Sequence, residues 1–516
     1  MLRNSCRTMS EKLKRLKFEN RTLEKLPIET SGDYLIQRPI PNACFSLVKP
    51  TPLENPKLVS HSPEALKLIG LQWDDDLIDY FSGNIEIPGA KYAAHCYCGH
   101  QFGSFAGQLG DGATMYIGEV VNGPSRTEIQ FKGAGKTPFS RTADGRKVLR
   151  SSLREYLCSE AMHHLGIPTT RAGTCIVSYD SRVVRDKFYD GNAEMEPCAV
   201  ITRLAETFLR FGSFEIGKET DMMTGRAGPS AGNSDIVTQL LDYTIDSFYP
   251  DISNKEDKYE EFIAEISRRT AKLAAKWQLV GFCHGVLNTD NMSIGQLTTY
   301  TPTHRSQITR APSDSESIAT MKYYDKLEKV GITIDYGPFG FMDRYDPEFI
   351  CNGSDHKGRY DYQSQPSICK WNLVKFAEQI DHVIPHEKSR EIITANYNPT
   401  FLNEMMTGAR QKLGLFGKDD ADTALFESFL NTMNDTAADF TNTFRALSSF
   451  ETDKDGKATN ESKAALIKHI VENCCHSVEE WKNSAMKTSG GGEIDMIRNE
   501  YNLYYMNHFI SLLEKG

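Results

Sequence analysis

The chain has 516 residues, of which 39% are hydrophobic and 25% are charged, a balance typical of a folded globular protein. This length favours two lobes, or two to three domains, over one compact core. The formal net charge of -10 argues against a dedicated nucleic-acid binder, because neutralising phosphates takes a basic surface. No apolar run approaches the ~18 residues that a membrane-spanning helix needs, so we expect no membrane span.

The first 94 residues predict no domain of their own. Within residues 1–25, the first 18 residues contain six lysines and arginines and only one acid, Glu11. This composition is typical of a mitochondrial transit peptide, and a solvated basic N-terminus is the alternative. We therefore expect a mitochondrial protein, or otherwise a cytoplasmic one. Residues 26–94 are rich in proline and predict an extended segment that wraps around a core.

Residues 95–225 predict a lobe built of strands and one helix. The stretch GHQFGSFAGQLGDGATMYIGEVV is rich in glycine and ends in apolar–polar alternation, which predicts strand, tight turn, strand. The next strand, TEIQFKGAG, carries Lys132 near its C-terminal end. Residues 147–167 place apolar side chains at helical spacing, with Gly166 as the C-cap, and Glu155 lies inside this helix. Two further strands are expected at TCIVS and CAVITRLA, with a DG turn between them.

Residues 226–365 predict a second lobe, in an α+β fold overall. Helical periodicity is seen at about 234–247 and 257–279, followed by the polar loop FCHGVLNTDN and a strand ending in Asp-Tyr-Gly at 335–337. Residues 294–330 are rich in Thr, Ser, Tyr and Lys without helical or strand period, which predicts a disordered loop insertion. Residues 366–516 predict a helical region that carries no evident chemistry.

Taken one by one, the motifs in these two lobes are weak. A Gly-Asp-Gly turn is more often a tight hairpin than a phosphate cradle, a lysine on a strand is usually solvated, and a helical glutamate usually faces water. Their order is more informative. A glycine loop, strand lysine, helix glutamate, His-containing loop that ends in Asn, and Asp-aromatic-Gly follow one another as in protein kinases. The sequence therefore predicts an ATP site of the kinase kind.

The chemistry of ATP explains this set of residues. Lys132 can neutralise phosphate charge, and Glu155 can hold that lysine in place. Asn291 and Asp335 offer the oxygen ligands that magnesium prefers.

One position departs from the kinase pattern H-R-D-L-x-x-x-N. The chain reads His284, Gly285, Val286, Leu287 and then Asn288 to Asn291, so a valine stands where kinases have the catalytic aspartate. A valine cannot accept a proton from an attacking hydroxyl, and the nearest carboxylate is Asp290. Either the chain is a dead kinase, or it presents a different phosphorus atom to a different base.

Several long stretches resemble the selenoprotein O family of protein adenylyltransferases. They include GHQFGSFAGQLGDGA, FLRFGSFE, HGVLNTDNMS and IDYGPFGFMDRYDP, and the resemblance covers most of residues 20–445. It implies a protein-kinase-like two-lobed fold with a helical C-terminal extension, which binds ATP in a flipped orientation with the γ-phosphate buried. AMP would then pass to Ser, Thr or Tyr hydroxyls of protein substrates, and diphosphate would leave.

The resemblance also implies roles for single residues. Asp290 would be the general base, Glu155 would position Lys132, and Asn291 with Asp335 would hold Mg²⁺ or Mn²⁺. The residues implied in ATP binding are Gly110, Gly112, Ala113, Lys132, Asp144, Gly145, Arg203 and Arg210. The two arginines would grip the γ-phosphate, whereas their residue type alone favours surface salt bridges. Ala113 stands where many bacterial members have an arginine.

Two rival functions remain at this point. One is a phosphotransferase that uses Asp290 as a relocated base, and the other is a catalytically dead, ATP-binding pseudokinase scaffold. The insertion at 294–330 separates Asn291 from Asp335 more widely than the family's short hairpin does. Cys351 matches a family cysteine that can pair with a C-terminal one, and no C-terminal Cys-x-x-Cys is found here. We expect Cys351 to be a buried or idle thiol.

Overall fold

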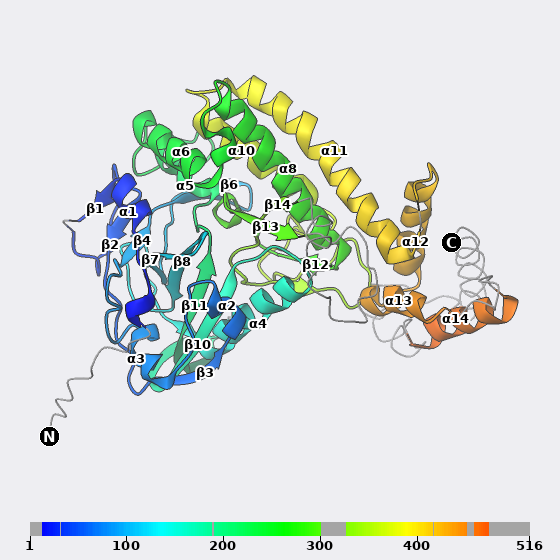
Figure 1. Ribbon diagram of the computed structural model, residues 1–516, viewed down its shortest axis with the longest axis horizontal. Helices are drawn as coiled ribbons and strands as arrows, with labels where there is room; N and C mark the ends of the chain where they lie inside the picture. Colours follow the sequence, from blue (N-terminus) through cyan, green and yellow to red (C-terminus); the bar gives the residue numbers. More distant parts are fainter. Residues whose placement is uncertain are drawn as a thin grey trace, which may run out of the picture. The chain divides into compact units, whose positions relative to one another are not determined.

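The computed structural model has mixed α and β structure, as expected, with a large sheet and many helices (Figure 1). It describes residues 13–30, 32–187, 190–300, 327–415, 417–450 and 459–473. The chain divides into two compact units. The first unit comprises residues 1–273, 288–337 and 369–397, and the second comprises 274–287, 338–368 and 398–516.

The described part of the first unit is built on a nine-stranded sheet. Its strand order is β1 (Ile28–Glu29), β2 (Phe45–Leu47), β4 (Ala93–His95), β7 (Thr114–Asn122), β8 (Ser125–Lys132), β11 (Ala193–Ala205), β10 (Arg171–Asp186) and β3 (Lys57–His61), with β9 (Lys147–Val148) also paired to β11. β1 runs parallel to β2, and the other pairs are antiparallel. A separate hairpin joins β5 (Cys98–Gln101) to β6 (Ser104–Gln108).

The strands at the centre of the sheet follow the sequence pattern. The expected strands at 114–121 and 127–135 are found as β7 and β8, which form a hairpin that turns at Gly123, where φ is +62°. The expected strands at 174–178 and 198–205 lie inside β10 and β11. Both strands run further than expected, because their ladder continues to the pair Asp186 and Ala193.

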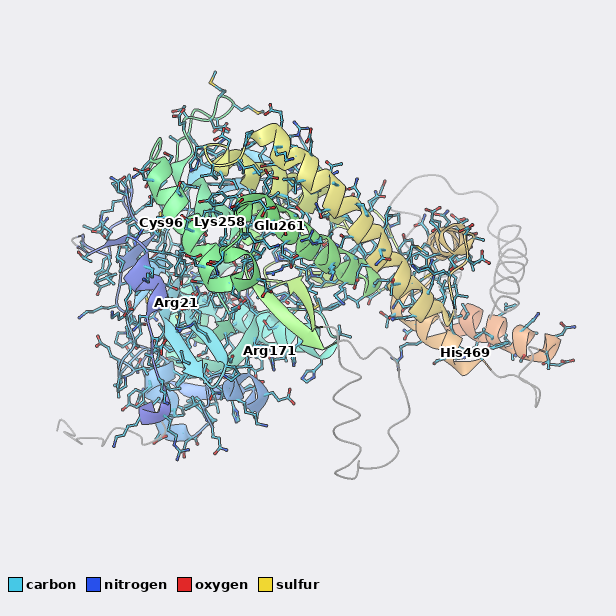
Figure 2. All side chains as sticks on the ribbon, turned by 45° about the horizontal axis from the view of Figure 1, so that its top comes forward. Arg21, Cys96, Arg171, Lys258, Glu261 and His469 are labelled. Carbon is cyan, nitrogen blue, oxygen red and sulfur yellow. The ribbon has the colours of Figure 1, made fainter. Side chains whose placement is uncertain are left out.

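The helix that carries Glu155 is α4 (Leu149–His164), and it packs on β10 and β11. Tyr156 of α4 shares a buried cluster with Ala172, Cys175 and Ile201 of the two strands. Arg171, labelled in Figure 2, adds an ion pair of 2.7 Å to Glu160 of the same helix. Apolar packing and this ion pair together fix α4 against the sheet.

The expected helices at 234–247 and 257–279 are confirmed as α6 and α8. The side chain of Asn233 caps α6 by accepting a hydrogen bond from the Ile236 amide (3.2 Å), as N-cap residues commonly do. The α-helices besides α4 are α1 (Arg21–Lys25), α2 (Pro63–Lys67), α3 (Ile78–Phe81), α5 (Phe211–Phe214), α6 (Ser234–Phe248), α7 (Pro250–Ser253), α8 (Lys258–Leu279), α10 (Gln365–Ala377), α11 (His386–Leu413), α12 (Asp422–Asp435), α13 (Phe440–Ala446) and α14 (Asn460–Asn473). Short 3-10 helices are η1 (Leu13–Arg15), η2 (Asp75–Leu77), η3 (Glu215–Gly217), η4 (Thr289–Asn291), η5 (Glu378–Ile380) and η6 (Leu447–Ser449).

The insertion at 294–330 corrects one expectation. Its two ends are not irregular: β13 (Gln296–Tyr300) pairs antiparallel with β14 (Leu327–Gly331), in a register from Gln296 opposite Gly331 to Tyr300 opposite Leu327. Each strand alone is too short to show a period, and pairing with a partner distant in sequence stabilises both. The middle of the insertion, 301–326, lies outside the described residues. β14 ends at Gly331, and between it and Asp335 only Thr333 pairs, in an isolated parallel bridge with Thr169, so the expected strand ending at Asp335 is not formed.

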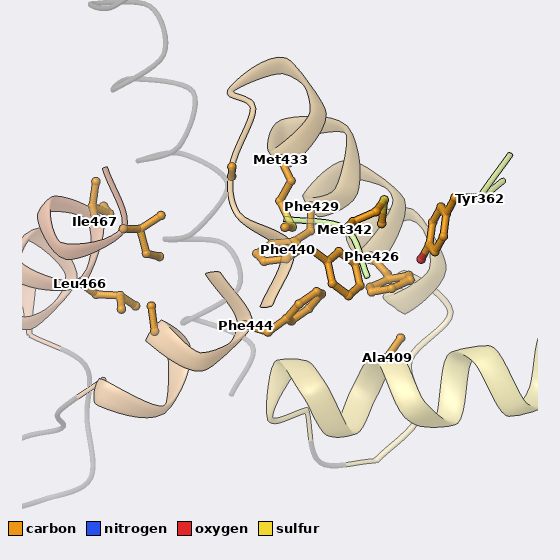
Figure 3. Packing of buried hydrophobic residues seen from close by; sticks show 13 residues of the cluster. Met342, Tyr362, Ala409, Phe426, Phe429, Met433, Phe440, Phe444, Leu466 and Ile467 are labelled. Atoms are coloured by element: carbon orange, nitrogen blue, oxygen red, sulfur yellow. The ribbon is translucent and has the colours of Figure 1, made fainter. Parts of the chain in front are cut away.

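The second unit is organised around aromatic packing. Phe429, Phe440 and Phe444 lie at the centre of a buried cluster between helices (Figure 3). Phe440 stacks on Tyr345 with ring centroids 6.0 Å apart and meets Phe444 edge-on at 5.2 Å. We call this group the phenylalanine cluster. Its described members also include Met342, Tyr362, Ala409, Phe426, Met433, Ala438, Ala446, Leu466, Ile467 and Ile470.

Cys351 belongs to the second unit as well and is half-buried. Its Sγ contacts the carbonyl oxygens of Pro338 (2.7 Å) and Cys283 (3.4 Å). Nearby, β12 (Phe282–Cys283) pairs with β15 (Gly340–Phe341). Among the residues that the structure describes, no helix is long and apolar enough to cross a bilayer.

Candidate active site

A cleft of about 890 Å³ opens in the first unit, and most of the residues implied in ATP binding line it. Its lining includes the predicted residues Gly110, Gly112, Ala113, Lys132, Asp144, Gly145 and Asp335. Basic side chains outnumber acidic ones: Lys132, Lys136, Arg141, Arg146, Lys147, Arg150 and Arg185 stand against Asp111, Asp144 and Asp335. A cleft of this size and charge suits a small polyanion.

Lys132 occupies the end of β8 and connects three elements. Its Nζ lies 2.7 Å from Glu155 Oε2 of α4 and 3.1 Å from Asp335 Oδ1. Glu155 is buried, and its charge is compensated there by Lys132 and Arg203. The structure thus brings together the strand lysine, the helix glutamate and the aspartate of the Asp-Tyr-Gly motif.

Arg203 and Arg210 are not surface residues, since each has only 1% of its area exposed. Arg203 Nη1 contacts both Asp335 Oδ1 and Glu155 Oε1 (3.1 Å for Glu155), and its Nη2 donates to Gln130 Oε1 (2.7 Å). Arg210 Nη1 donates to Asp335 Oδ2 (2.8 Å). Arg203 Nε and Arg210 Nη2 are buried and have no hydrogen-bond partner. Neither arginine is among the residues that line the cleft. Both contact it through Asp335, and each keeps one buried donor without a partner.

Asp335 is the point where these cations meet. Burial alone would raise its pKa, but Lys132, Arg203 and Arg210 outweigh burial and hold the pKa well below its ordinary value. Its backbone has φ of +58°, a left-handed conformation that Asp tolerates better than most residues. Two residues before Asp335, the backbone of Thr333 is held by two hydrogen bonds of 3.0 Å. Its amide donates to the Pro168 carbonyl, and its carbonyl accepts from the Thr170 amide.

Asp290 and Asn291 lie in η4, beside Asp335. Arg210 Nη1 bridges the two segments, because it donates both to the Asp290 carbonyl (2.8 Å) and to the Asp335 carboxylate. Backbone hydrogen bonds from Phe211 to Met292 (2.8 Å) and from Ile294 to Leu209 (3.0 Å) fix the loop further. The insertion between Asn291 and Asp335 therefore does not separate them in space.

Asp290 is buried, and its environment raises the pKa of its carboxyl group. Burial, with a contribution from the buried Glu215, raises its pKa to about 7, against the opposing effects of Arg210 and Gln101. Oδ2 accepts a 3.3 Å hydrogen bond from Gln101 Nε2, whereas Oδ1 is buried without a hydrogen-bond partner. A carboxylate with a pKa near neutrality and a free oxygen is suited to general base catalysis.

Gln101 is a residue that the sequence analysis missed as part of the site. It ends β5, next to His100, whose amide donates to Thr289 Oγ1 (2.7 Å) and whose Nδ1 lies 2.9 Å from Glu215 Oε1. A Cβ at Gly99 would come within 2.3 Å of Asp290 Oδ1, so only glycine allows this approach. The motif GHQFG contains all three residues, but no spacing rule connects it to a loop almost 190 residues away.

The Gly-Asp-Gly turn has a packing role in addition to any ligand contact. Gly110 has φ of +82°, and a Cβ there would come within 2.3 Å of the Phe139 ring. The loop that follows β8 packs here through Thr137 Oγ1, which donates to the Asp111 carbonyl (2.7 Å). In the same loop Asp144 pairs with Arg185 (2.7 Å). Burial would raise the pKa of Asp144, but hydrogen bonds from Arg185 and from the Arg146 amide lower it.

The oxygen donors beside Lys132 fit a hard divalent cation. Asp335 supplies a carboxylate that stays ionised, and Asn291 supplies an amide in the neighbouring loop; such oxygens are preferred ligands of Mg²⁺. Among the described residues, no three His, Cys, Asp or Glu side chains gather as a metal-binding group. A cation here would therefore take its remaining ligands from phosphate oxygens and water, as Mg²⁺ commonly does.

The fold and site thus define a protein of mixed α and β structure with a basic, nucleotide-sized cleft that Asp335 and Lys132 line together. The sequence model of one protein family, described as "Protein adenylyltransferase SelO", matches residues 38–303 and 324–510. The chain belongs to this family. The model leaves out residues 304–323, which fall within the insertion.

Curated relatives agree with this assignment. The human "Protein adenylyltransferase SelO, mitochondrial" is 50% identical over 483 residues, which cover 90% of this chain and 66% of the human protein. The zebrafish "Protein adenylyltransferase SelO-1, mitochondrial" is 47% identical and is covered to 68%. The "Protein nucleotidyltransferase YdiU" of Azoarcus sp. (strain BH72) is 39% identical over 442 residues, 84% of this chain and 75% of that protein. The chain spans about two thirds of the length of the human relative.

Proposed function

We propose that this chain is a protein adenylyltransferase of kinase-like, two-lobed fold. It moves AMP from ATP to Ser, Thr or Tyr hydroxyls of protein substrates and releases diphosphate. The observation that carries the proposal is the contact of one carboxylate, Asp335, with Lys132 and two fully buried arginines. Family membership and the names of the relatives support the same activity.

The arrangement of the cations supports a triphosphate that enters with its γ-phosphate innermost. Arg203 and Arg210 each keep a buried nitrogen without a partner, and guanidinium groups hold phosphate oxygens through paired hydrogen bonds. A γ-phosphate held by the two arginines leaves the α-phosphate nearer the mouth of the cleft, where an acceptor hydroxyl can approach. Gly110, Gly112, Ala113, Asp144 and Gly145, which line the same cleft, would hold the rest of the nucleotide.

In the transfer step, the acceptor oxygen attacks the α-phosphorus and forms a new P–O bond. The bond from that phosphorus to the diphosphate oxygen breaks, and diphosphate leaves with the electron pair. Asp290 takes the hydroxyl proton on Oδ1, the oxygen without a hydrogen-bond partner. Gln101 holds the other oxygen, Oδ2, and so fixes the direction in which the base points. The carboxylate replaces the one that a kinase would have at Val286.

Asn291 and Asp335 would hold Mg²⁺, with Mn²⁺ as an alternative. When bound there, the cation shields phosphate charge that would otherwise repel the base and the acceptor. Lys132 and Glu155 keep Asp335 in position from the other side through the contacts described above.

A mitochondrial location is part of the proposal. The human, mouse and zebrafish relatives carry the word mitochondrial in their names, and the first residues of this chain are basic and poor in acids.

Intact-protein mass spectrometry after incubation with ATP and Mg²⁺ tests the activity. We expect AMP adducts on the chain itself or on added proteins, and none with Asp335→Ala. Phosphate adducts would instead support a kinase. If the wild-type chain binds ATP and no adduct of either kind forms, the scaffold function replaces the proposal.

A further inference from the structure

A second lysine stands beside Lys132 on the same face of the sheet. Lys132 of β8 is registered opposite Ile201 of β11, and Lys147 of β9 is registered opposite Ala199 of the same strand. Both β8 and β9 run along one edge of β11. Side chains of a strand alternate between faces with a period of two, so partners of residues 199 and 201 point to one face. Lys132 and Lys147 therefore project in the same direction, about two residues apart along the strand.

The close packing around Gly133 places Lys147 at the cleft. A Cβ at Gly133, where φ is +100°, would come within 2.2 Å of the Ala199 carbonyl and 3.0 Å of the Lys147 Cβ. The Gly133 amide donates to the Ala113 carbonyl (2.6 Å). Lys147 thus packs against Gly133, whose amide is hydrogen-bonded to Ala113. The Ala113 side chain itself carries no charge. Lys147 lines the cleft together with both Ala113 and Lys132.

Lys147 has no counter-charge in contact, in contrast to three of the other cations that line the cleft. Lys132 is paired with Glu155 and Asp335, Arg150 with Glu196, and Arg185 with Asp144. Within the described residues, the Lys147 ammonium makes no hydrogen bond or ion pair. Burial, and then repulsion from Lys132, lower the pKa of Lys147 to about 8, although Glu155 and Asp335 act in the opposite direction and Arg203 adds to the repulsion. An anion that enters the cleft would relieve this repulsion.

We propose that Lys147 binds the phosphate chain of the nucleotide and, with Lys132, forms a pair of phosphate-binding lysines on one face of the sheet. This inference rests on the proposed function only in taking a nucleoside triphosphate as the ligand. The family resemblance implies no role for Lys147.

The test is the affinity of the full chain for ATP, ADP, AMP and adenosine, measured by calorimetry without an acceptor protein. Lys147→Gln removes the charge, and Lys147→Arg keeps it. We expect Lys147→Gln to weaken ATP binding about tenfold, as for the loss of one charge-assisted contact. The penalty should shrink as phosphates are removed and be absent for adenosine. Lys147→Arg should bind ATP within about threefold of the wild type.

The matched control is Lys91→Gln, which removes the same charge from a half-exposed lysine of the first unit that pairs loosely with Glu24 (3.9 Å). It should bind ATP like the wild type. If Lys147→Gln does not fold, Lys147→Met, which keeps most of the aliphatic stem, takes its place. An unchanged ATP affinity, or an equal penalty for ATP and adenosine, would overturn the inference. The binding measurement does not depend on AMP transfer. A chain that binds ATP through Lys147 but transfers no AMP would therefore contradict only the proposed function.

Discussion

The two units of the chain differ in the kind of buried centre that each contains. The centre of the first unit is charged: Lys132, Arg203 and Arg210 surround Asp335, and Glu155 completes the network. The centre of the second unit is the phenylalanine cluster, whose members are apolar and lie mostly on helices. Burial of apolar surface is favourable by itself, whereas buried ion pairs rarely contribute net stability.

The difference shows which centre is built for function. In the charged centre and beside it, Arg203 Nε, Arg210 Nη2, Asp111 Oδ2 and Asp290 Oδ1 are buried without hydrogen-bond partners. Such groups are costly in a folded protein unless a ligand completes them. We therefore expect substitutions in the charged centre to act first on activity, and substitutions in the phenylalanine cluster to act first on stability. Four predictions test this contrast, from the largest effect to the smallest.

The largest effect is expected for Asp335→Asn, which keeps the shape of the side chain and removes its charge. Lys132 and the two buried arginines lose their shared counter-charge, and a ligand of the proposed metal site becomes neutral. The rate of AMP transfer should fall by at least about 1,000-fold, and the free energy of unfolding by about 3 kcal/mol. Initial rates and denaturant unfolding measure the two effects. Asp76→Asn, at an exposed aspartate of the same unit, should change neither.

Asp290→Asn should affect catalysis without affecting binding. Loss of a general base lowers kcat by roughly 100- to 10,000-fold, while the arginines and Lys132 that would hold the phosphates are unchanged. Gln101→Ala, which removes only the partner of Asp290 Oδ2, should lower kcat by about tenfold. Transfer rates and ATP affinity are measured side by side. A loss of ATP affinity that matches the loss in rate would assign Asp290 to binding.

Phe440→Ala should unfold the second unit more easily. The ring is buried and contacts Tyr345 and Phe444, so its removal should cost about 3–5 kcal/mol. Leu402→Ala is the matched control, because the Leu402 side chain is 59% exposed and should cost little. Thermal and denaturant unfolding report the loss. ATP affinity at low temperature should stay within about twofold of the wild type, and a large drop would contradict the contrast between the two centres.

The smallest effect is a pH dependence of stability at Glu128, a buried carboxyl of β8. Burial, and then Glu119, raise its pKa to about 8. Between its unfolded pKa of 4.5 and about 8, the folded state holds a proton that the unfolded chain releases, so stability falls as pH rises through this range. Glu128→Gln should remove about 1–2 kcal/mol of this loss between pH 6 and pH 9. The exposed Glu86→Gln should follow the wild-type curve, and an unchanged pH dependence in Glu128→Gln would assign the loss to other groups.

Local patterns predicted the parts of the site that are local. Alternation and helical spacing place Lys132 on a strand and Glu155 on a helix, and the order of motifs adds Asn291 and Asp335. The structure brings these four residues into one region, but their roles stay predictions. Residue type alone favoured surface salt bridges for Arg203 and Arg210, and only the family resemblance implied that they bind ATP, because periodicity does not indicate which distant carboxylate a side chain will meet. Gln101 was missed, and β13 with β14 was wrongly expected to be irregular, for the same reason: the partners are remote in sequence.

The central claim is that the α-phosphorus of ATP is the one transferred, and parallel labelling tests it most directly. The purified chain is incubated with Mg²⁺ and ATP labelled either on the α- or on the γ-phosphate, and protein-bound label is followed for the wild type and for Asp335→Asn. Our account predicts label from the α-phosphate only, and none above background in the variant. Label that arrives from the γ-phosphate would contradict it and identify the chain as a kinase.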